Sequence, residues 1–264
     1  MMKSGFIGMG NMAQALAEGF VKSGMLEAGD ICAFAPNQEK LRKNAERIGF
    51  VPMDSVAALV EACDTVIMAC KPYQVEGVLA QIGELLRGKA MVSICAGWDM
   101  EKYSKYLDPS VRFQFVMPNT PAMVGEGVLL FEEKNSLEKE EREEIMRLFG
   151  SLGLVEEVPS SLMGIAGAVT GCGPAFIDLL MEAYADAAVK YGVPRNTAYR
   201  LVSQMVLGAA ALQKMTGEHP GSLKDKVCSP KGTTIVGCAS LEEDGFRAAC
   251  IHSIDAVMNR KNLD

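Results

Sequence analysis

The sequence predicts an α/β fold class, with a doubly wound sheet over residues 1–159 and an all-α domain over residues 160–264. Short apolar runs alternate with helical periodicity through about the first 150 residues, which is typical of a sheet covered by helices on both faces. A glycine-rich turn, Gly8-x-Gly10-x-x-Ala13, joins the first apolar run to the first helix. After Pro159 only helical patterns follow, so we place the domain boundary between residues 159 and 160.

Each strand expected in the first domain is a short apolar run that ends at a loop. These runs are residues 4–7, 31–35, 65–70, 90–95, 111–117, 127–131 and 154–158. Helices are expected directly after the glycine turn and over residues 38–47, 54–61, 74–86, 100–106 and 136–149. The 65–70 run is almost wholly apolar, as expected of a strand that is buried on both faces.

The second domain reads as helices over residues 160–169, 174–191, 194–215 and 244–260. The 174–191 and 194–215 helices are apolar around much of their circumference. A region of about 100 residues cannot easily bury such helices within itself. We therefore expect a homodimer with shared helices rather than a self-contained bundle.

Composition limits the possible partners and chemistry. The net charge of −7 argues against nucleic acid or an anionic membrane as the main partner. No apolar run approaches the roughly 20 residues of a membrane span, and the start has no secretory pattern, so we expect a cytoplasmic protein. The eight cysteines form no Cys-x-x-Cys pair and read as buried, reduced thiols, with no metal site. His219 and His252 are far apart, so we expect chemistry without a histidine base.

The glycine turn favours a dinucleotide over a plain structural turn. Gly8 permits the sharp turn, Gly10 has no Cβ to block a pyrophosphate, and Ala13 lets the helix pack closely on the strand. The helix N-terminus offers free N–H groups to the phosphates. The first domain is therefore expected to be Rossmann-like and to bind NAD(P).

The loop after the second strand bears on cofactor choice. An NAD-selective protein usually has an acid at this strand end, and none is present in Ala35-Pro36-Asn37-Gln38. Asn37 and the next helix N-terminus could accept a 2′-phosphate, with Lys40 or Arg42 nearby. We favour NADP over NAD; the alternative is a turn that never touches the ribose.

We expect two further strand-end loops to complete the cofactor site: Cys70-Lys71-Pro72-Tyr73 and Cys95-Ala96-Gly97-Trp98. Strand-end turns without a ligand can have the same composition. A rigid polar loop, Met117-Pro118-Asn119-Thr120-Pro121, follows a later strand and could be a turn alone. The expected cofactor-binding residues are Gly8, Met9, Gly10, Asn11, Met12, Ala35, Pro36, Asn37, Ala69, Cys70, Lys71, Pro72, Cys95, Ala96, Gly97 and Asn119.

A candidate anion site lies in the helical domain. The segment looks like the start of a helix whose first N–H groups are free, and it reads Ser229-Pro230-Lys231-Gly232-Thr233-Thr234. Such an N-terminus could bind a substrate carboxylate. The alternative is ordinary capping by Ser and Thr.

A longer segment that includes these residues resembles the signature of the pyrroline-5-carboxylate reductase family. It runs from His219-Pro220 through Lys224-Asp225 to Thr234. Further landmarks of that family follow in order along the chain: Gly8 to Ala13, Lys71-Pro72, Ala96-Gly97, Met117 to Pro121, and Thr170 to Phe176. The resemblance implies hydride transfer from NADPH, or else NADH, to the C=N carbon of L-1-pyrroline-5-carboxylate, which gives L-proline.

The resemblance also implies residue roles. Main-chain N–H groups of Gly232, Thr233 and Thr234 would hold the substrate carboxylate, with Ser229 adjacent, and the Thr234 hydroxyl would contact the ring nitrogen as the catalytic residue. The family is a dimer with interleaved helices, in some members a decamer, with the site between subunits.

The chain departs from the family pattern at three positions: Lys231 replaces a small residue, Cys172 a serine, and Phe176 a tyrosine. Two other functions stay open at this point. One is another NADP-dependent imine, keto-acid or hydroxy-acid reductase, for which Lys190 and Lys214 are the available helical lysines. The other is a non-catalytic NAD(P)-binding protein.

Overall fold

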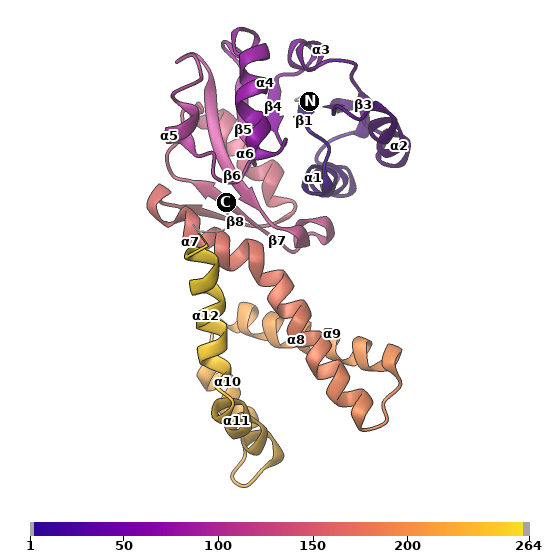
Figure 1. Cartoon of the computed structure of the whole chain (residues 1–264), viewed down its shortest axis with the longest axis vertical. Coiled ribbons are helices and arrows are strands. Elements are labelled where there is room, and N and C mark those ends of the chain that lie inside the picture. Colours follow the sequence, from indigo (N-terminus) through magenta and orange to yellow (C-terminus); the bar gives the residue numbers. More distant parts are fainter. Residues whose placement is uncertain (1–2, 261–264) are drawn as a thin grey trace. The chain divides into compact units, whose positions relative to one another are not determined.

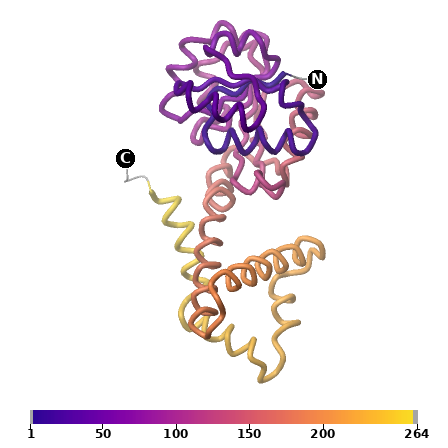
Figure 2. Tube along the Cα trace, turned by 90° about the vertical axis from the view of Figure 1, so that its right-hand side faces the viewer, coloured from indigo at the N-terminus to yellow at the C-terminus, as the bar shows by residue number. Residues whose placement is uncertain are grey.

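The computed structural model describes residues 3–260 and divides into two compact units between Gly171 and Cys172 (Figures 1 and 2). The first unit contains the whole sheet, and the second is helical. Residues 160–171, which the sequence assigns to the helical domain, belong to the first unit by packing: Met163 is 4% exposed and packs with the strands.

The sheet of the first unit has eight strands among the described residues, in the order β3-β2-β1-β4-β5-β6-β7-β8. Their bounds are β1 Ser4–Ile7, β2 Ile31–Phe34, β3 Val51–Pro52, β4 Thr65–Met68, β5 Ala90–Ser93, β6 Arg112–Pro118, β7 Gly127–Glu132 and β8 Gly153–Val158. All neighbours from β3 to β6 are parallel, β7 runs antiparallel to β6, and β8 is parallel to β7. The order 3-2-1-4-5-6 is that of a Rossmann sheet, which confirms the predicted fold class.

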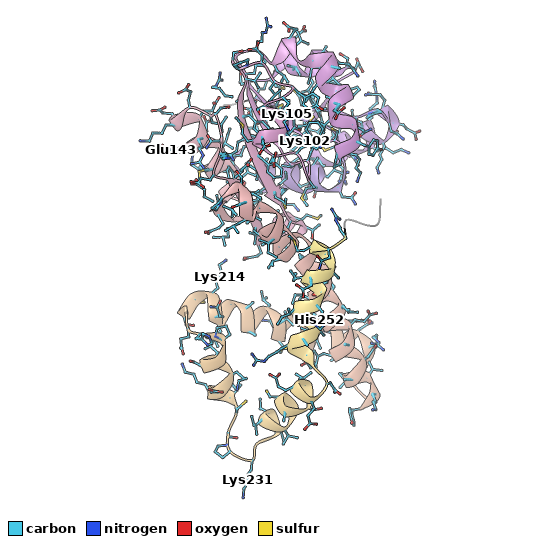
Figure 3. The ribbon with its side chains drawn as sticks, turned by 60° about the vertical axis from the view of Figure 1, so that its left-hand side comes forward. Lys102, Lys105, Glu143, Lys214, Lys231 and His252 are labelled. Atoms are coloured by element: carbon cyan, nitrogen blue, oxygen red, sulfur yellow. The ribbon has the colours of Figure 1, made fainter. Side chains whose placement is uncertain are left out.

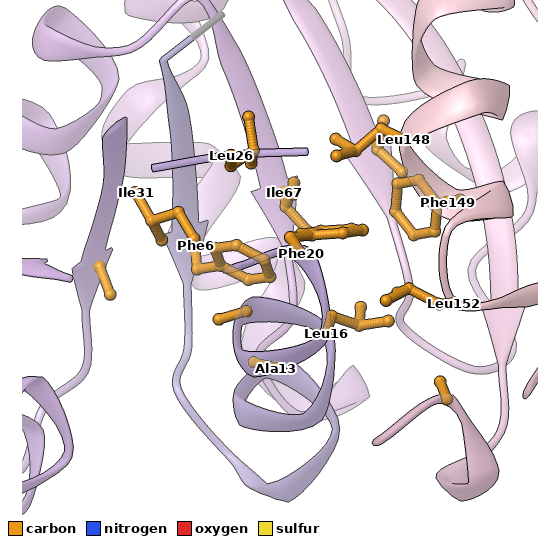
Figure 4. Packing of buried hydrophobic residues seen from close by; sticks show 14 of the residues in the cluster. Phe6, Ala13, Leu16, Phe20, Leu26, Ile31, Ile67, Leu148, Phe149 and Leu152 are labelled. Atoms are coloured by element: carbon orange, nitrogen blue, oxygen red, sulfur yellow. The ribbon is translucent and has the colours of Figure 1, made fainter. Parts of the chain in front are cut away.

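Helices cover both faces of this sheet. On one face α1 (Asn11–Lys22), α2 (Gln38–Ile48) and α6 (Lys139–Gly150) pack on the strands, and Figure 4 shows Leu16 and Phe20 of α1 and Phe149 of α6 in this core. The Phe20 and Phe149 rings meet edge to face with centroids 5.3 Å apart. The opposite face carries α3 (Val56–Ala62), α4 (Val75–Ile82), α5 (Met100–Tyr103) and α7 (Met163–Gly167). β1, β4 and β5 are buried along their whole length, so a ligand can reach these strands only where they end.

The second unit consists of α8 (Gly173–Lys190), α9 (Arg195–Thr216), α10 (Pro220–Val227), α11 (Thr233–Glu243) and α12 (Phe246–Met258). Among the described residues of this unit, three form the buried cluster: Ala185, Ala198 and Val202. Large apolar side chains are exposed along the helices: Leu179, Leu201, Leu207, Met215, Val236 and Ile251 are each more than half exposed. A single copy of this unit thus leaves its apolar faces uncovered.

One helical stretch, Ser160–Lys190, is long and apolar enough to cross a membrane by length and composition alone. It runs through residues 168–172, which form a π-helical turn, and 17% of its most apolar window is buried. The sequence predicted two helices here, over residues 160–169 and 174–191, whereas the helical stretch continues from one to the other through the π-helical turn. Pro174 lies in the first turn of α8, as expected, because its missing N–H needs no partner there.

Several other predictions differ in detail from the structure. The two-residue strand β3 and the helix α10 were not predicted, and Pro194 precedes α9 as its N-cap rather than starting it.

The cysteines are less buried than expected: Cys32, Cys63 and Cys95 are buried, four others are half-buried, and Cys250 is exposed. All eight are free thiols. Among residues 3–260, no three His, Cys, Asp or Glu side chains are grouped to hold a metal.

Candidate cofactor and substrate sites

A cleft of about 730 Å³ opens in the first unit where β1, β2, β4 and β5 end. Most residues predicted to bind the cofactor line it: Gly8, Met9, Gly10, Asn11, Met12, Ala35, Pro36, Asn37, Ala69, Cys70, Lys71, Pro72, Cys95 and Ala96. The described lining residues include two lysines, Lys40 and Lys71, and no acid. The cleft is thus locally basic although the chain has a net charge of −7.

Gly8 makes the turn that opens the cleft. Its φ is +99°, which L side chains rarely adopt, and its N–H donates to the Phe34 carbonyl oxygen at 2.8 Å. A Cβ here would lie 2.7 Å from the Ala69 carbonyl oxygen. Both the dihedral angle and the close approach of the β4 end therefore require glycine.

Gly10 is the N-cap of α1 and faces open space, since a Cβ built on it meets no heavy atom within 4 Å. No side chain caps the helix, so its first N–H groups are available. A bare N-terminus beside an open glycine backbone fits the pyrophosphate of a dinucleotide.

Asn37 caps α2 through a 2.9 Å hydrogen bond that its Oδ1 accepts from the Lys40 N–H. The two basic residues predicted near this loop are placed differently. Lys40 lines the cleft, whereas Arg42 pairs with Asp54 at 3.4 Å. Lys40 is therefore the cation beside the end of β2.

The loops after β4 and β5 are tied together. The Trp98 indole N–H donates to the Pro72 carbonyl oxygen at 3.1 Å, and the Lys71 N–H donates to Gln74 Oε1 at 3.1 Å. Trp98 is 3% exposed and packs against Tyr103, whose pKa is raised by burial. These bonds fix one wall of the cleft.

Two predicted residues, Gly97 and Asn119, do not line this cleft. Gly97 makes a turn with φ +74°. The Asn119 side chain is 6% exposed, donates to the Thr170 carbonyl oxygen at 3.0 Å and accepts from the Val128 N–H at 2.8 Å. Its amide is therefore already used in joining β7 to the π-helical turn at residues 168–172.

Some lining residues were absent from the predicted set, namely Ala13, Lys40, Gln74, Ile94 and Thr120. Thr120 directly follows Asn119 at the end of β6, and Ile94 directly precedes Cys95. Ile94 and Thr120 could both have been predicted as lining residues from their positions at the ends of β5 and β6.

The predicted substrate segment starts α11 in the second unit. Gly232 is the N-cap, and no side chain caps the helix, while Thr233 and Thr234 are exposed in its first turn. A Cβ on Gly232 would collide with the Ser229 hydroxyl oxygen. The loop is therefore closed tightly around Ser229 and leaves α11 with free N–H groups that can bind an anion.

Lys231 lies at the tip of the loop between α10 and α11, with its side chain pointing away from the helices (Figure 3). Its φ of +61° makes it the one described non-glycine residue with a left-handed backbone. The residue type that suits such a position is glycine.

Family models match both parts of the chain. Residues 160–263 match the model described as pyrroline-5-carboxylate reductase dimerisation, and residues 3–97 match the model described as NADP oxidoreductase, coenzyme F420-dependent.

Individual relatives match over nearly the full length. A pyrroline-5-carboxylate reductase of Treponema pallidum is 40% identical over 98% of this chain and 99% of its own length. That of Escherichia coli is 35% identical over 98% of this chain and 96% of its own. The crystal structure of a Plasmodium falciparum pyrroline carboxylate reductase with NADP bound has 30% identity and a TM-score of 0.89, covering 98% of this chain and 96% of that one.

Proposed function

Because the chain belongs to the pyrroline-5-carboxylate reductase family, we propose that it reduces L-1-pyrroline-5-carboxylate to L-proline with NAD(P)H, the last step of proline synthesis. The observation that carries this function is the 40% identity to a named reductase over 98% of the chain. The cofactor is NADP(H), which the Plasmodium falciparum relative holds in its crystal.

We assign the cofactor to the cleft at the ends of β1, β2, β4 and β5. The N-terminus of α1 and the open backbone at Gly10 would hold the pyrophosphate, and Asn37 with Lys40 would hold the 2′-phosphate. When bound, NADPH supplies the hydride. The absence of an acid from the lining supports NADPH over NADH.

We assign the substrate carboxylate to the start of α11, where the N–H groups of Gly232, Thr233 and Thr234 would bind it beside Ser229. The Thr234 hydroxyl would orient the ring nitrogen as the catalytic residue. A cyclic imine is basic enough to be partly protonated near neutral pH, so the reaction needs position and a dry site more than a strong general acid. This chemistry agrees with a site that contains no histidine.

The second domain, proposed as residues 160–264, is the dimerisation and substrate-binding domain. The family match over residues 160–263 and the exposed apolar faces of α8 and α9 support a homo-oligomer, either a dimer or a decamer built from dimers. The free thiols support a cytoplasmic location, and the net charge of −7 supports small molecules rather than nucleic acid or membrane as partners.

The test is turnover with the purified protein. Addition of L-1-pyrroline-5-carboxylate should cause oxidation of NADPH with formation of an equal amount of L-proline, and a parallel reaction with NADH should run at a higher KM. A protein that binds NADPH but turns over with neither cofactor would contradict the proposed activity.

A further inference from the structure

Two cysteines lie next to each other in the wall of the cofactor cleft, and the proposed reaction uses neither. Cys70 follows β4 and Cys95 follows β5, two parallel neighbours in which Met68 pairs with Ser93. The ladder continues with a 2.9 Å hydrogen bond from the Ile94 N–H to the Met68 carbonyl oxygen. Neighbouring strands lie about 4.8 Å apart, within the Cα separation of roughly 4.4–6.8 Å that a disulfide spans.

The two thiols differ in character. Cys95 Sγ lies 3.2 Å from the Cys70 carbonyl oxygen and 3.4 Å from the Met68 carbonyl oxygen, so the Cys95 side chain is directed at the end of the strand that Cys70 follows. The neighbouring Cys95 thiol lowers the pKa of Cys70, whereas the Cys70 side chain and burial raise the pKa of Cys95. Cys70 is half-buried and Cys95 is 2% exposed. Cys70 therefore has the properties of an attacking thiolate, and Cys95 those of a resolving thiol.

We propose that Cys70 and Cys95 form a reversible oxidation site, at which a peroxide joins the two sulfurs as a disulfide and weakens cofactor binding. The Cys70 thiolate attacks one peroxide oxygen, the O–O bond breaks, and the leaving oxygen takes a proton and departs as water, which leaves a sulfenic acid on Cys70. The Cys95 sulfur then attacks the Cys70 sulfur, the S–O bond breaks, and a second water leaves with the thiol proton. Two thiols lose two electrons, and one peroxide becomes two waters.

Two other thiol pairs provide a contrast. Cys32 and Cys63 belong to one buried cluster, each is 2% exposed and neither lines the cleft; burial raises the pKa of Cys63 to about 12. The sulfurs of Cys228 and Cys238 are 3.9 Å apart, and desolvation raises the pKa of Cys228. Because the thiolate is the reacting form, both pairs are poorer targets than Cys70.

The link to the cofactor follows from the loops that carry the two cysteines. Residues 69–72 and 95–96 all line the cleft, so a covalent bond between Cys70 and Cys95 locks two of its walls to each other and changes the surface that a dinucleotide meets. Conversely, a dinucleotide bound in the cleft covers Cys70 and slows its reaction. This coupling rests on the proposed cofactor site, whereas formation of the disulfide does not.

Peptide mapping tests the disulfide without any turnover. The full-length protein is treated with hydrogen peroxide, its remaining thiols are alkylated, and it is cut before aspartate and after lysine and arginine. Each pair then gives its own linked peptides: 64–87 with 90–98 for Cys70–Cys95, 30–40 with 54–63 for Cys32–Cys63, and 227–231 with 232–243 for Cys228–Cys238. We expect the first linked pair to form fastest and to disappear on reduction with dithiothreitol.

Three comparisons complete the test. Saturating NADP⁺ should slow formation of the 64–87/90–98 link several-fold, and the oxidised protein should have a several-fold higher KM for NADPH than its own reduced form. Cys63→Ser should form the same link, while Cys95→Ser should lose it and carry the oxidation as sulfenic or sulfinic acid on Cys70. Linkage only at another pair, or irreversible oxidation of Cys70 in the wild type without a link, would overturn the proposal. A link that forms unchanged in the presence of NADP⁺ would overturn its coupling to the cofactor.

Discussion

The indole N–H of Trp98 donates a 3.1 Å hydrogen bond to the carbonyl oxygen of Pro72, and so joins the loop after β5 to the loop after β4. Both loops border the cofactor cleft, but Trp98 itself does not line it. Trp98 is therefore a positioning residue for the Cys70–Gln74 wall.

We expect Trp98→Phe to raise the KM for NADPH roughly 2- to 10-fold, since a net hydrogen bond contributes about 0.5–1.5 kcal/mol. The KM for pyrroline-5-carboxylate should stay near its wild-type value. The matched control is Tyr106→Phe, which removes only a surface hydrogen bond to Glu76. Steady-state kinetics, with each substrate varied in turn, measures both KM values. An equal rise in the two values would mean a general structural effect and contradict the positioning role of Trp98.

The two glycines of the first turn should respond differently to alanine. Gly8→Ala places a Cβ 2.7 Å from the Ala69 carbonyl oxygen at a φ of +99°, so it should lower the free energy of unfolding by about 1–3 kcal/mol. Gly10→Ala meets no protein atom and should stay folded, yet bind NADP⁺ about tenfold more weakly or worse, because the new methyl group occupies the pyrophosphate path. Thermal unfolding and NADP⁺ titration separate the two effects. Wild-type binding by Gly10→Ala would remove this turn from the phosphate site.

Lys40 should set part of the preference for NADPH. Lys40→Ala removes the cation beside Asn37, and the KM for NADPH should rise roughly tenfold, the scale of a charge-assisted hydrogen bond of about 1.5 kcal/mol. The KM for NADH should change little, because NADH has no 2′-phosphate. Arg42→Ala is the control, since Arg42 pairs with Asp54 and does not line the cleft. If Arg42→Ala shows the selective loss instead, the assignment is wrong.

Thr234 should matter for its hydroxyl group. Thr234→Ala should lower kcat/KM by roughly 10- to 1,000-fold, the range for loss of an oriented hydrogen bond at a reacting centre. Thr234→Ser keeps a hydroxyl and should recover much of the activity. Full activity in the alanine variant would exclude Thr234 from the site.

The backbone at Lys231 should limit stability. With φ at +61°, Lys231→Gly should raise the free energy of unfolding by about 0.5–1 kcal/mol, because glycine adopts this conformation without the Cβ penalty. Lys231→Ala keeps a Cβ and should give no such gain, which separates the backbone effect from loss of the charge. Urea unfolding at one fixed protein concentration measures both variants.

Much of the first unit was predictable because local sequence and tertiary packing agree there. The turn from Gly8 to Ala13 requires glycine at one position and a small residue at another, and each requirement can be read directly from the residue type. The apolar runs between the helices mark seven of the eight strands. β3 was missed because Val51–Pro52 is too short to show a period and lies at the sheet edge.

Other features depend on contacts that no local pattern contains. Asn119 looks like a ligand-binding residue in sequence, but its amide bonds to Val128, 9 residues on, and to Thr170, 51 residues on. α10 begins with Pro220 and Gly221, which are typical of a loop, and is capped by His219, whose Nδ1 accepts from the Gly221 N–H. The predicted strand ends do meet around one cleft, while the direction of each side chain depends on packing.

The small core of the second unit has a consequence for the energetics of the whole chain. Up to residue 260, its clustered buried residues are Ala185, Ala198 and Val202, while α8, α9, α11 and α12 expose apolar side chains to water. If a second copy covers these faces, the free energy that holds the helices together includes a term in subunit concentration. Dilution alone would then loosen the segment that carries Gly232 to Thr234, so the number of copies in a cell would itself influence how well each copy holds its substrate.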